Sequence, residues 1–365
     1  MALTTVRPEG MGFNTGRRNL VINGAMQVAQ RGTSNTGVTS GGYKEAPDRW
    51  NIAMSSAGTW TVSQSTTVPS GEGFSHSYKF DCTTADASLS AGDHLVLAHY
   101  IEAQNVAHLC YGTASAKKLT LSFWVRSAKT GTYVLELLRN DDSRHIAQTY
   151  TISSADTWER KTLTFDGDTG GSAIPHDNGR GFEVNFWLAA GSTFSGGTLA
   201  TSWASTTAAN RAVGVLNLAD STSNDWYVTG VQLEVGENAS DFEHRSFGEE
   251  MALCQRYFHR TTGSTYTPHG GGAVFDADTS DIHVHLPQAM GTSPSLSFGG
   301  NVRVSRGSAL TTDVIAVTNA TGTSSSNPCV AWLRADHGSG YNTGDAVYCF
   351  NDNDATGHVS YDAEL

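Results

Sequence analysis

Paired carboxylates are the first residues in this sequence that could do chemistry, because glycosidases place two carboxyl groups about 5–9.5 Å apart in a cleft. The candidates are Asp141 and Asp142, Asp166 and Asp168, and Asp276, Asp278 and Asp281. All of them stand near Gly, Ser or Thr, where aspartate commonly hydrogen-bonds to the backbone of its own turn. We therefore interpret them as turn residues and expect no catalytic residue among them.

Two histidines could contribute to a metal site. His283 and His285 are two positions apart on an expected strand, so both imidazoles face the same side. A zinc site needs three or four ligands held by surrounding hydrogen bonds, and only these two are in register. A polar strand face also explains the pair, and we assign no metal ligand. Structural calcium at Asp276, Asp278 and Asp281 stays open, although their spacing does not match an EF-hand.

The five cysteines show no catalytic or zinc-binding signature. They are Cys82, Cys110, Cys254, Cys329 and Cys349, and no two of them form a CxxC motif. An odd number at wide spacing is typical of buried free thiols in a protein made in a reducing cytoplasm. Cys329 and Cys349 could instead pair across two late strands. The sequence also lacks a GxSxG motif, a P-loop and an HExxH motif, so we expect no enzyme.

Tryptophan is the better functional clue, because aromatic faces stack on the CH groups of sugars and also fill sandwich cores. Four of the eight tryptophans lie within expected strands, where we expect them in the core: Trp124, Trp158, Trp187 and Trp226. Trp203 lies in a Thr/Ser-rich loop, where exposure is more plausible. If the protein binds a glycan, we expect Trp203 to contact it together with Tyr43 or Trp60.

The composition favours strands over helices and disfavours some partners. Only 16% of the residues are charged and 39 are Gly, with Ser, Thr, Asn and Gly between short apolar runs. The formal net charge of -12 disfavours nucleic acid and anionic lipid surfaces. No apolar run approaches the roughly 18 residues of a membrane span, and no signal peptide is recognisable. We therefore expect synthesis in the cytoplasm and no membrane insertion.

Short β-strands are the elements that would position these residues. Apolar and polar residues alternate with a period of two in most of the runs, and turn-rich loops separate them. The expected strands are 60–63, 77–82, 94–102, 119–127, 132–138, 158–165, 182–189, 226–235, 273–275, 282–286, 296–298, 301–305, 314–318, 330–334 and 346–350. Strands of this length without intervening helices predict an all-β sandwich or barrel. Residues 32–42 and 261–272 are expected to be mostly loop.

Two further local signals are a hairpin and a helix. Asn23 and Gly24 stand between alternating apolar residues and predict a tight β-hairpin over 19–30. The one convincing helix is 248–256, with acidic residues in its first turn and an arginine at its end. We expect it to act as a hinge between two domains, over 248–260.

The N-terminal segment, residues 1–18, is Gly-rich and locally basic. It contains Arg7, Arg17 and Arg18. The segment is either a loose terminus or an arm that docks on a neighbouring subunit. In the second case, these three arginines would take part in assembly.

Several segments resemble bacteriophage tail-fibre-like proteins. They are RNLVINGAMQVAQRGTS at 18–34, APDRW at 46–50, FDCTTADA at 80–87, LTLSFWVRSAKTGTY at 119–133 and WYVTGVQLEVGENASDFEHRSFGEEMALCQRYF at 226–258. The last segment is the most specific. The resemblance covers nearly the whole chain and is best from Asn19 to Phe258.

The resemblance implies a fold and a domain order. The docking arm, 1–18, would be followed by a carbohydrate-binding-module-like jelly-roll sandwich over 19–247, the hinge helix and a smaller C-terminal β domain over 261–365. The family shares no catalytic motif, and its glycan-contacting residues vary between members, so no site residue is transferred. Such proteins are often homotrimers, and closed symmetric trimers cover exposed strand edges.

The function implied by the resemblance is that of a structural virion protein made in the host cytoplasm. We expect a tail-fibre or adhesin subunit that contacts other virion proteins and host-surface polysaccharide. Two alternatives stay open. One is a structural component without a receptor, such as a head decoration, collar or tail component. The other is a glycan depolymerase, which is disfavoured because no β-helical repeat is visible.

Overall fold

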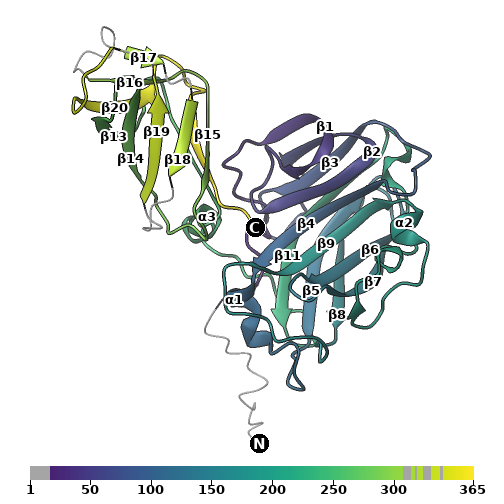
Figure 1. Ribbon diagram of the computed structural model, residues 1–365. Helices are drawn as coiled ribbons and strands as arrows, with labels where there is room; N and C mark the ends of the chain where they lie inside the picture. The colour runs from purple at the N-terminus through teal and green to yellow at the C-terminus, as the bar shows by residue number, and fades with distance from the viewer. Residues whose placement is uncertain (1–16, 307–313, 317–318, 324–329, 338–339) are drawn as a thin grey trace, which may run out of the picture. The chain divides into compact units, whose positions relative to one another are not determined.

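The computed structural model describes residues 17–306, 314–316, 319–323, 330–337 and 340–365. Antiparallel sheets dominate these residues, which confirms the all-β prediction (Figure 1). The chain divides into two compact units. Within the described residues, the first consists of 17–26, Thr36–Gly42 and Asn51–His244, and the second of Gln27–Asn35, Tyr43–Trp50 and the described part of Arg245–Leu365. None of the helices in the described part of the chain is long and apolar enough to cross a membrane.

The first unit is a two-layer sandwich. One layer contains β1 (Ser34–Tyr43), β2 (Trp50–Ser65), β4 (His94–Glu102), β9 (Arg180–Ala190), β6 (Gly131–Arg139), β7 (Arg144–Ile152) and β10 (Ala204–Ser205). The other contains β3 (Ser77–Thr84), β11 (Asp225–Val235), β5 (Leu119–Ser127) and β8 (Glu159–Phe165). The long strand β2 pairs with β3 through Thr59–Ser65 and so connects the layers. Consecutive strands from β3 to β6 alternate between the layers, which is jelly-roll connectivity.

Short helical segments lie in the connections of the first unit. They are α1 (Ala103–Val106), η1 (Ala107–Leu109), α2 (Ser192–Ser195), η2 (Ala208–Asn210) and η3 (Leu218–Asp220). Of these, α2 lies just beyond β9 and η2 precedes Arg211. Both therefore bring loop side chains to the end of the β4–β9 layer.

Alternating side chains fill the space between the two layers. The fully buried residues on two facing strands are Phe182, Val184, Phe186 and Leu188 on β9, and Leu119, Leu121, Phe123 and Val125 on β5. The ring of Phe186 lies 5.1 Å from that of Phe123 and 5.8 Å from that of Trp226, measured between centroids. Each such buried side chain stabilises the fold by about 1.5–3 kcal/mol. Because a strand has a period of two, this core face leaves Glu183, Asn185 and Trp187 on the opposite face.

The hairpin predicted over 19–30 is wrong, because 19–28 forms no strand. Instead, the N–H of Leu20 donates to the carbonyl of Leu233 at 2.9 Å, and the N–H of Val231 donates to the carbonyl of Gly24 at 3.0 Å. β3 pairs with β11 only as far as Val228, so the N-terminal segment supplies partners beyond that point. The apolar residues of this segment reflect burial against the sheet and not a local strand pair.

Several strands differ from the sequence expectations. Residues 34–43 form β1 where we expected a loop, most of 261–272 belongs to β12 and β13, and β7 was not expected. Two of these strands, β1 and β13, were missed because they contain glycine. A Cβ at Gly41 of β1 would lie 2.6 Å from the carbonyl oxygen of Ile52, and one at Gly272 would lie 1.7 Å from that of Asp281. At these positions glycine allows the backbone of the neighbouring strand to come close, although glycine in the sequence is also typical of turns.

The second unit has two sheets of its own. The smaller contains β12 (Phe258–Thr262), β21 (His358–Asp362) and β15 (Ser295–Gly299). The larger contains β17 (Val314–Ala316), β16 (Val302–Ser305), β20 (Ala346–Asn351), β13 (Pro268–Val274), β14 (Thr279–His285), β19 (Val330–Asp336) and β18 (Asn319–Thr323). The expected helix is α3 (Phe247–Gln255), which begins with a capping box between Ser246 and Glu249 and belongs to this unit.

Two N-terminal segments also belong to the second unit. Arg31 lies 3.0 Å from a carboxylate oxygen of Asp362 and 3.3 Å from one of Glu364, and Arg49 pairs with the other oxygen of Glu364. The buried carboxylate of Asp48 lies 3.6 Å from Arg31. Residues that are far apart in the sequence therefore complete one buried charge cluster.

Candidate functional site

The face of β4, β9 and β6 that points away from the sandwich core carries the candidate site. Because these strands are paired in register, their outward residues form rows across the sheet. The rows are Tyr100–Glu183–Leu138, Ala98–Asn185–Glu136 and Val96–Trp187–Val134.

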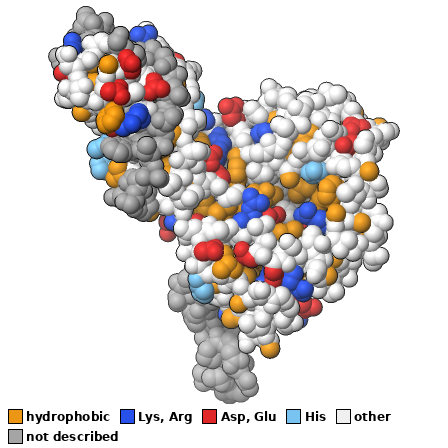
Figure 2. Space-filling view, in the orientation of Figure 1, with side chains coloured by type: hydrophobic (Ala, Val, Ile, Leu, Met, Phe, Trp, Pro, Cys, Tyr) orange, Lys and Arg blue, Asp and Glu red, His pale blue; other side chains and the backbone are white. Residues whose placement is uncertain are grey.

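A cavity of about 210 Å³ lies over this face, and we call it the β9 cavity. Its lining includes Ala53 of β2, His94 and Tyr100 of β4, Phe194 of α2 and Arg211. Figure 2 shows hydrophobic and basic side chains gathered over β4 and β9 in the middle of this face. Ligand sites commonly combine aromatic walls with a few convergent polar groups, as this cavity does.

Aromatic rings form the floor and one wall of the β9 cavity. Trp187 is only 1% exposed and lies at the floor. The ring of Phe194 lies 5.4 Å from that of Trp187, and the ring of His94 lies 4.9 Å from that of Phe194. Arg180 stacks 3.5 Å above the centroid of Tyr100. Phe194 and His94 are half-buried, so both rings keep surface that a ligand can contact.

A buried carboxylate organises the polar side of the cavity. Glu136 accepts hydrogen bonds from Nε and Nη2 of Arg211 at 2.8 and 2.7 Å, and from Nε1 of Trp187 at 3.1 Å. His145 Nδ1 lies 2.8 Å from it, and Asn185 Nδ2 donates to it at 3.2 Å. Burial alone would raise the pKa of Glu136, but the hydrogen bonds from His145 and Arg211 hold it below its ordinary value. The carboxylate therefore stays charged and fixes the side chains around it.

Arg211 supplies hydrogen-bond donors at the cavity. Its guanidinium lies 5.0 Å from the ring centroid of Trp187. Burial would lower the pKa of Arg211, but the hydrogen bonds and charge of Glu136 raise it, so the side chain is permanently cationic. Nε and Nη2 bond to Glu136, whereas Nη1 has no hydrogen bond to any residue that the structure describes. This end of the guanidinium can donate to a ligand oxygen.

The chemistry of the β9 cavity suits binding better than hydrolysis. A general acid for glycoside cleavage needs a raised pKa, whereas the pKa of Glu136 is lowered. The second carboxylate, Glu183, is held by Nη1 of Arg180 and Nδ2 of Asn185, each at 3.2 Å. The cavity can therefore offer ring contacts and hydrogen bonds, with both carboxylates already engaged.

The structure does not place the three predicted glycan-binding residues in one site. Trp60 is fully buried and donates its Nε1–H to the carbonyl of Ala57 at 2.7 Å, so its ring cannot contact a ligand. Trp203 is half-buried, and its Nε1–H donates to the carbonyl of Asp166 at 2.6 Å. Tyr43 is the last residue of β1, and the division of the chain assigns it to the second unit. None of the three lines the β9 cavity.

The four tryptophans expected in the core have three different environments. Trp226 is fully buried between the layers, in agreement with the expectation. Trp187 is buried on the opposite face of its layer, beneath the β9 cavity. Trp124 and Trp158 are only half-buried, so neither belongs to the core.

The residues expected to take part in assembly are described only in part. Arg7 lies outside the described residues. Arg17 donates to the carbonyl of Asn19 at 3.1 Å, and Arg18 donates to the carbonyl of Asp241 at 2.6 Å. Arg18 therefore ties the start of the described chain to a distant segment of the first unit, whereas this bond of Arg17 is local.

Three of the turn aspartates accept hydrogen bonds from groups within the chain. Asp168 accepts hydrogen bonds from Arg144 at 2.8 Å, Asp281 accepts from Arg334 at 2.7 Å, and Asp276 accepts from backbone N–H groups of its own turn. The two histidines of β14 are exposed, and no cluster of three potential metal ligands occurs among the described residues. The free thiols there are Cys82, Cys110, Cys254 and Cys349, while Cys329 lies outside.

The residues of the β9 cavity were only partly visible in the sequence. The run 182–189 places aromatic and aliphatic residues on its core face, and the same period places Glu183, Asn185 and Trp187 together on the other. That polar and aromatic mixture was the available signal. Phe194 and Arg211 come from loops, where no periodicity predicts which strand they meet.

Neither a family model nor a curated protein matches the sequence. Solved structures that are similar to part of the chain include the enzymatically active domain of tailspike protein 4 of bacteriophage CBA120, which is 14% identical over 60% of this chain and 21% of that chain (TM-score 0.32). A putative sugar-binding protein from Bacteroides thetaiotaomicron is 12% identical over 60% of this chain and 100% of that chain (TM-score 0.33). The N-terminal cellulose-binding domain of Cellulomonas fimi β-1,4-glucanase C is 9% identical over 56% and 99%, respectively (TM-score 0.28). The chain spans about a fifth of the tailspike structure's length.

Proposed function

We propose that this protein is a glycan-binding structural subunit of a bacteriophage virion, a tail-fibre or adhesin subunit, and that the β9 cavity is its glycan site. The observation that carries the glycan proposal is the cavity's combination of two partly exposed rings, Phe194 and His94, with the donors of Arg211. Sugars present CH groups to aromatic rings and hydroxyl oxygens to donors of this kind. The fixed Glu136–Arg211 pair holds those donors in place before a ligand arrives, which lowers the entropic cost of binding.

We propose binding without cleavage. The two carboxylates closest to the cavity, Glu136 and Glu183, are committed to protein hydrogen bonds. The pKa of Glu136 is lowered, whereas the acid in glycoside hydrolysis requires a raised pKa. The proposed role is therefore recognition of a host-surface polysaccharide.

The virion part of the proposal rests on the sequence resemblance, above all on 226–258. In this proposal the subunits form a homotrimer, and the segment 1–18 docks on a neighbouring virion protein. The first unit contacts the host glycan, and the assembly holds several copies of the cavity. Several weak sites then act together, so that adhesion exceeds the affinity of any one site.

A binding screen of the purified protein against host cells and host-surface polysaccharides tests the proposal, with product analysis in the same tubes. We expect saturable binding without new reducing ends. New reducing ends would contradict the assignment of a non-catalytic role and favour a depolymerase. A well-folded protein that binds none of the host polysaccharides would contradict the glycan role and favour a structural subunit without a receptor.

A further inference from the structure

We propose that the first unit contains a second saccharide site, for one neutral sugar residue, on the outer face of the layer formed by β3, β11, β5 and β8. A cavity of about 240 Å³ lies on this face, and we call it the β5 cavity. Its lining comes from β5, β8, β11 and the loop residues 71–74 and 241–244. It shares no lining residue with the β9 cavity, so the inference is independent of the function proposed above.

Trp124 supplies the apolar surface of the β5 cavity. Its neighbours Phe123 and Val125 are fully buried between the layers, so the period of the strand directs Trp124 outward. The register places it directly opposite Arg160 of β8 and Thr229 of β11. Because Trp124 is half-buried, part of its ring is available for stacking on the CH face of a sugar.

Three further rings form one wall of this cavity. The centroids of Phe74 and Phe242 lie 5.0 Å apart, those of Phe74 and His244 5.1 Å, and those of Phe242 and His244 4.9 Å. Gly230 of β11 makes this packing possible, because a Cβ there would lie 2.5 Å from Cζ of Phe74. Its φ of +61° is also one that other residues rarely adopt. A tryptophan, an aromatic cluster and a glycine that accommodates the cluster therefore meet at one cavity.

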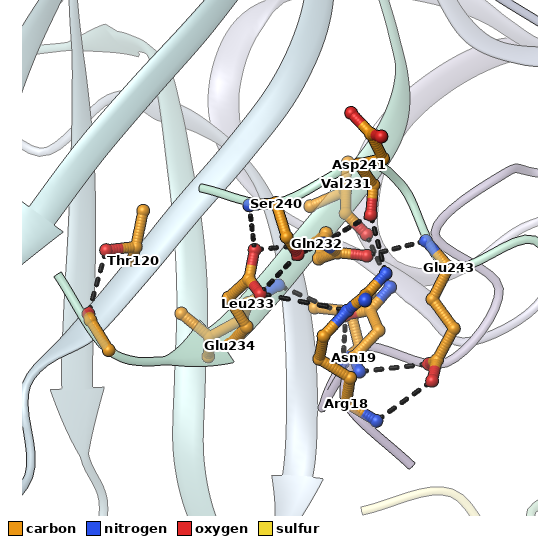
Figure 3. Close-up of polar contacts among 12 residues, drawn as sticks. Arg18, Asn19, Thr120, Val231, Gln232, Leu233, Glu234, Ser240, Asp241 and Glu243 are labelled. Carbon is orange, nitrogen blue, oxygen red and sulfur yellow. Dashed lines mark hydrogen bonds and ion pairs between the residues drawn. The ribbon is translucent and has the colours of Figure 1, made fainter. Parts of the chain in front are cut away.

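Two carboxylates supply hydrogen-bond acceptors. Glu72 and Asp241 line the cavity and are exposed, and their carboxylate oxygens have no hydrogen bond or ion pair within the part of the chain that the structure describes. Figure 3 shows the carboxylate of Asp241 directed away from the polar network beneath it. Arg160 is nearby but donates Nη2 to the carbonyl of Ser240 at 2.8 Å. Sugar hydroxyls can donate to the two acidic side chains, whereas a sulfated or uronic sugar would be repelled.

The polar network in Figure 3 fixes this wall of the cavity in advance. Gln232 is fully buried; its Nε2 donates to the carbonyl of Asp241 at 3.2 Å, and its Oε1 accepts the N–H of Glu243 at 2.8 Å. The carboxylate of Glu243 in turn accepts the N–H groups of Arg18 and Asn19 at 2.9 and 3.0 Å. The chain on both sides of Phe242 is therefore held to β11, so the loop does not have to be ordered when a ligand binds.

Fluorine NMR of the full-length protein labelled with 5-fluorotryptophan can report on each cavity separately. Trp124 lies in the β5 cavity and Trp187 in the β9 cavity, and Trp124→Phe and Trp187→Phe assign the two resonances. The probes are the methyl glycosides of glucose, galactose, mannose and xylose at millimolar concentrations. We expect at least one of them to shift the Trp124 resonance in a saturable manner.

Two variants test whether that shift reports the proposed site. The double substitution Glu72→Gln and Asp241→Asn should weaken the Trp124 response about tenfold, because hydrogen bonds to charged acceptors are replaced by weaker ones. Gly230→Ala should weaken it too by displacing Phe74, while the Trp187 resonance reports that the opposite face is intact.

The outcomes separate the two sites. No saturable shift of Trp124 with any of the four probes, or a shift that is unchanged in the double variant, would overturn the second site. A shift of Trp187 alone would also overturn it while supporting the β9 cavity. A saturable shift of the Trp124 resonance that is weakened in the double variant supports the second site, whether or not the Trp187 resonance also shifts.

Discussion

Arg211 donates two parallel hydrogen bonds, of 2.8 and 2.7 Å, to the buried carboxylate of Glu136, which lies 75 residues earlier in the sequence. This bidentate geometry is the strongest form of an arginine–carboxylate pair. It ties the loop after η2 to the outward face of β6, and it places the arginine beside Trp187. The pair therefore links the stability of the sandwich to the shape of the β9 cavity.

Replacing Arg211 with Ala should destabilise the protein by about 3 kcal/mol, because it leaves Glu136 as a buried charge with one partner fewer. Arg211→Lys keeps the positive charge but cannot form the bidentate pair. Its loss of stability should therefore be smaller. Denaturant unfolding monitored by tryptophan fluorescence measures both. If both variants unfold with the same free energy as the wild type, the pair does not stabilise the fold.

Acid should weaken the first unit through Glu136. The pKa of Glu136 is lowered in the folded state. Its contribution to folding stability is therefore fully present above the pKa of the unfolded chain, about 4.3, and is lost as the pH falls through the pKa of the folded state. The stability difference between the wild type and Glu136→Gln should therefore shrink below about pH 4.3, at no more than roughly 1.4 kcal/mol per pH unit. Denaturant unfolding between pH 3 and 7 in steps of about half a unit gives this difference. A difference that stays constant over this range would contradict the assigned shift.

The second unit should depend on Glu364, which pairs with both Arg31 and Arg49. Removing its charge with Glu364→Gln weakens a cluster whose arginines are almost fully buried, and we expect a loss of about 3 kcal/mol. Differential scanning calorimetry should show the loss in the transition of the second unit. Asp278→Asn, at an exposed turn of the same unit, is the matched control and should change stability by less than about 0.5 kcal/mol. Equal effects of the two variants would contradict the importance of the cluster.

Alternating side chains in the sequence predicted several of the strands well. The expected strands 94–102 and 119–127 coincide with β4 and β5, because their core residues alternate without interruption. β1 was missed because its glycines, which the pairing with β2 needs, are also the usual residues of loops. At such positions the local sequence favours a loop, whereas pairing with a distant strand favours a strand. The local sequence alone cannot show which of the two forms.

The candidate site was less predictable than the fold. Trp60 was selected by residue type, yet the period of β2 directs it into the core. Trp187 was expected to be a core residue, and it is buried, but on the face that carries the cavity. Nothing in the sequence indicated a role for Arg211, because it meets its partner Glu136 only when the loop folds back over the sheet. Chemistry that depends on contacts between distant segments appears only in the folded chain.

The most direct test of the proposed glycan site is a calorimetric titration of host-surface oligosaccharide into the wild type, Phe194→Ala and Phe247→Ala. Phe194 is a half-buried ring of the β9 cavity, and Phe247 is a 55% exposed ring of the second unit that serves as the matched control. Removing a ring that stacks on the ligand should weaken binding about tenfold. We expect this loss for Phe194→Ala, with melting temperatures showing a folded variant, and unchanged binding for Phe247→Ala. Binding by Phe194→Ala that is as tight as that of the wild type would contradict the placement of the glycan in the β9 cavity.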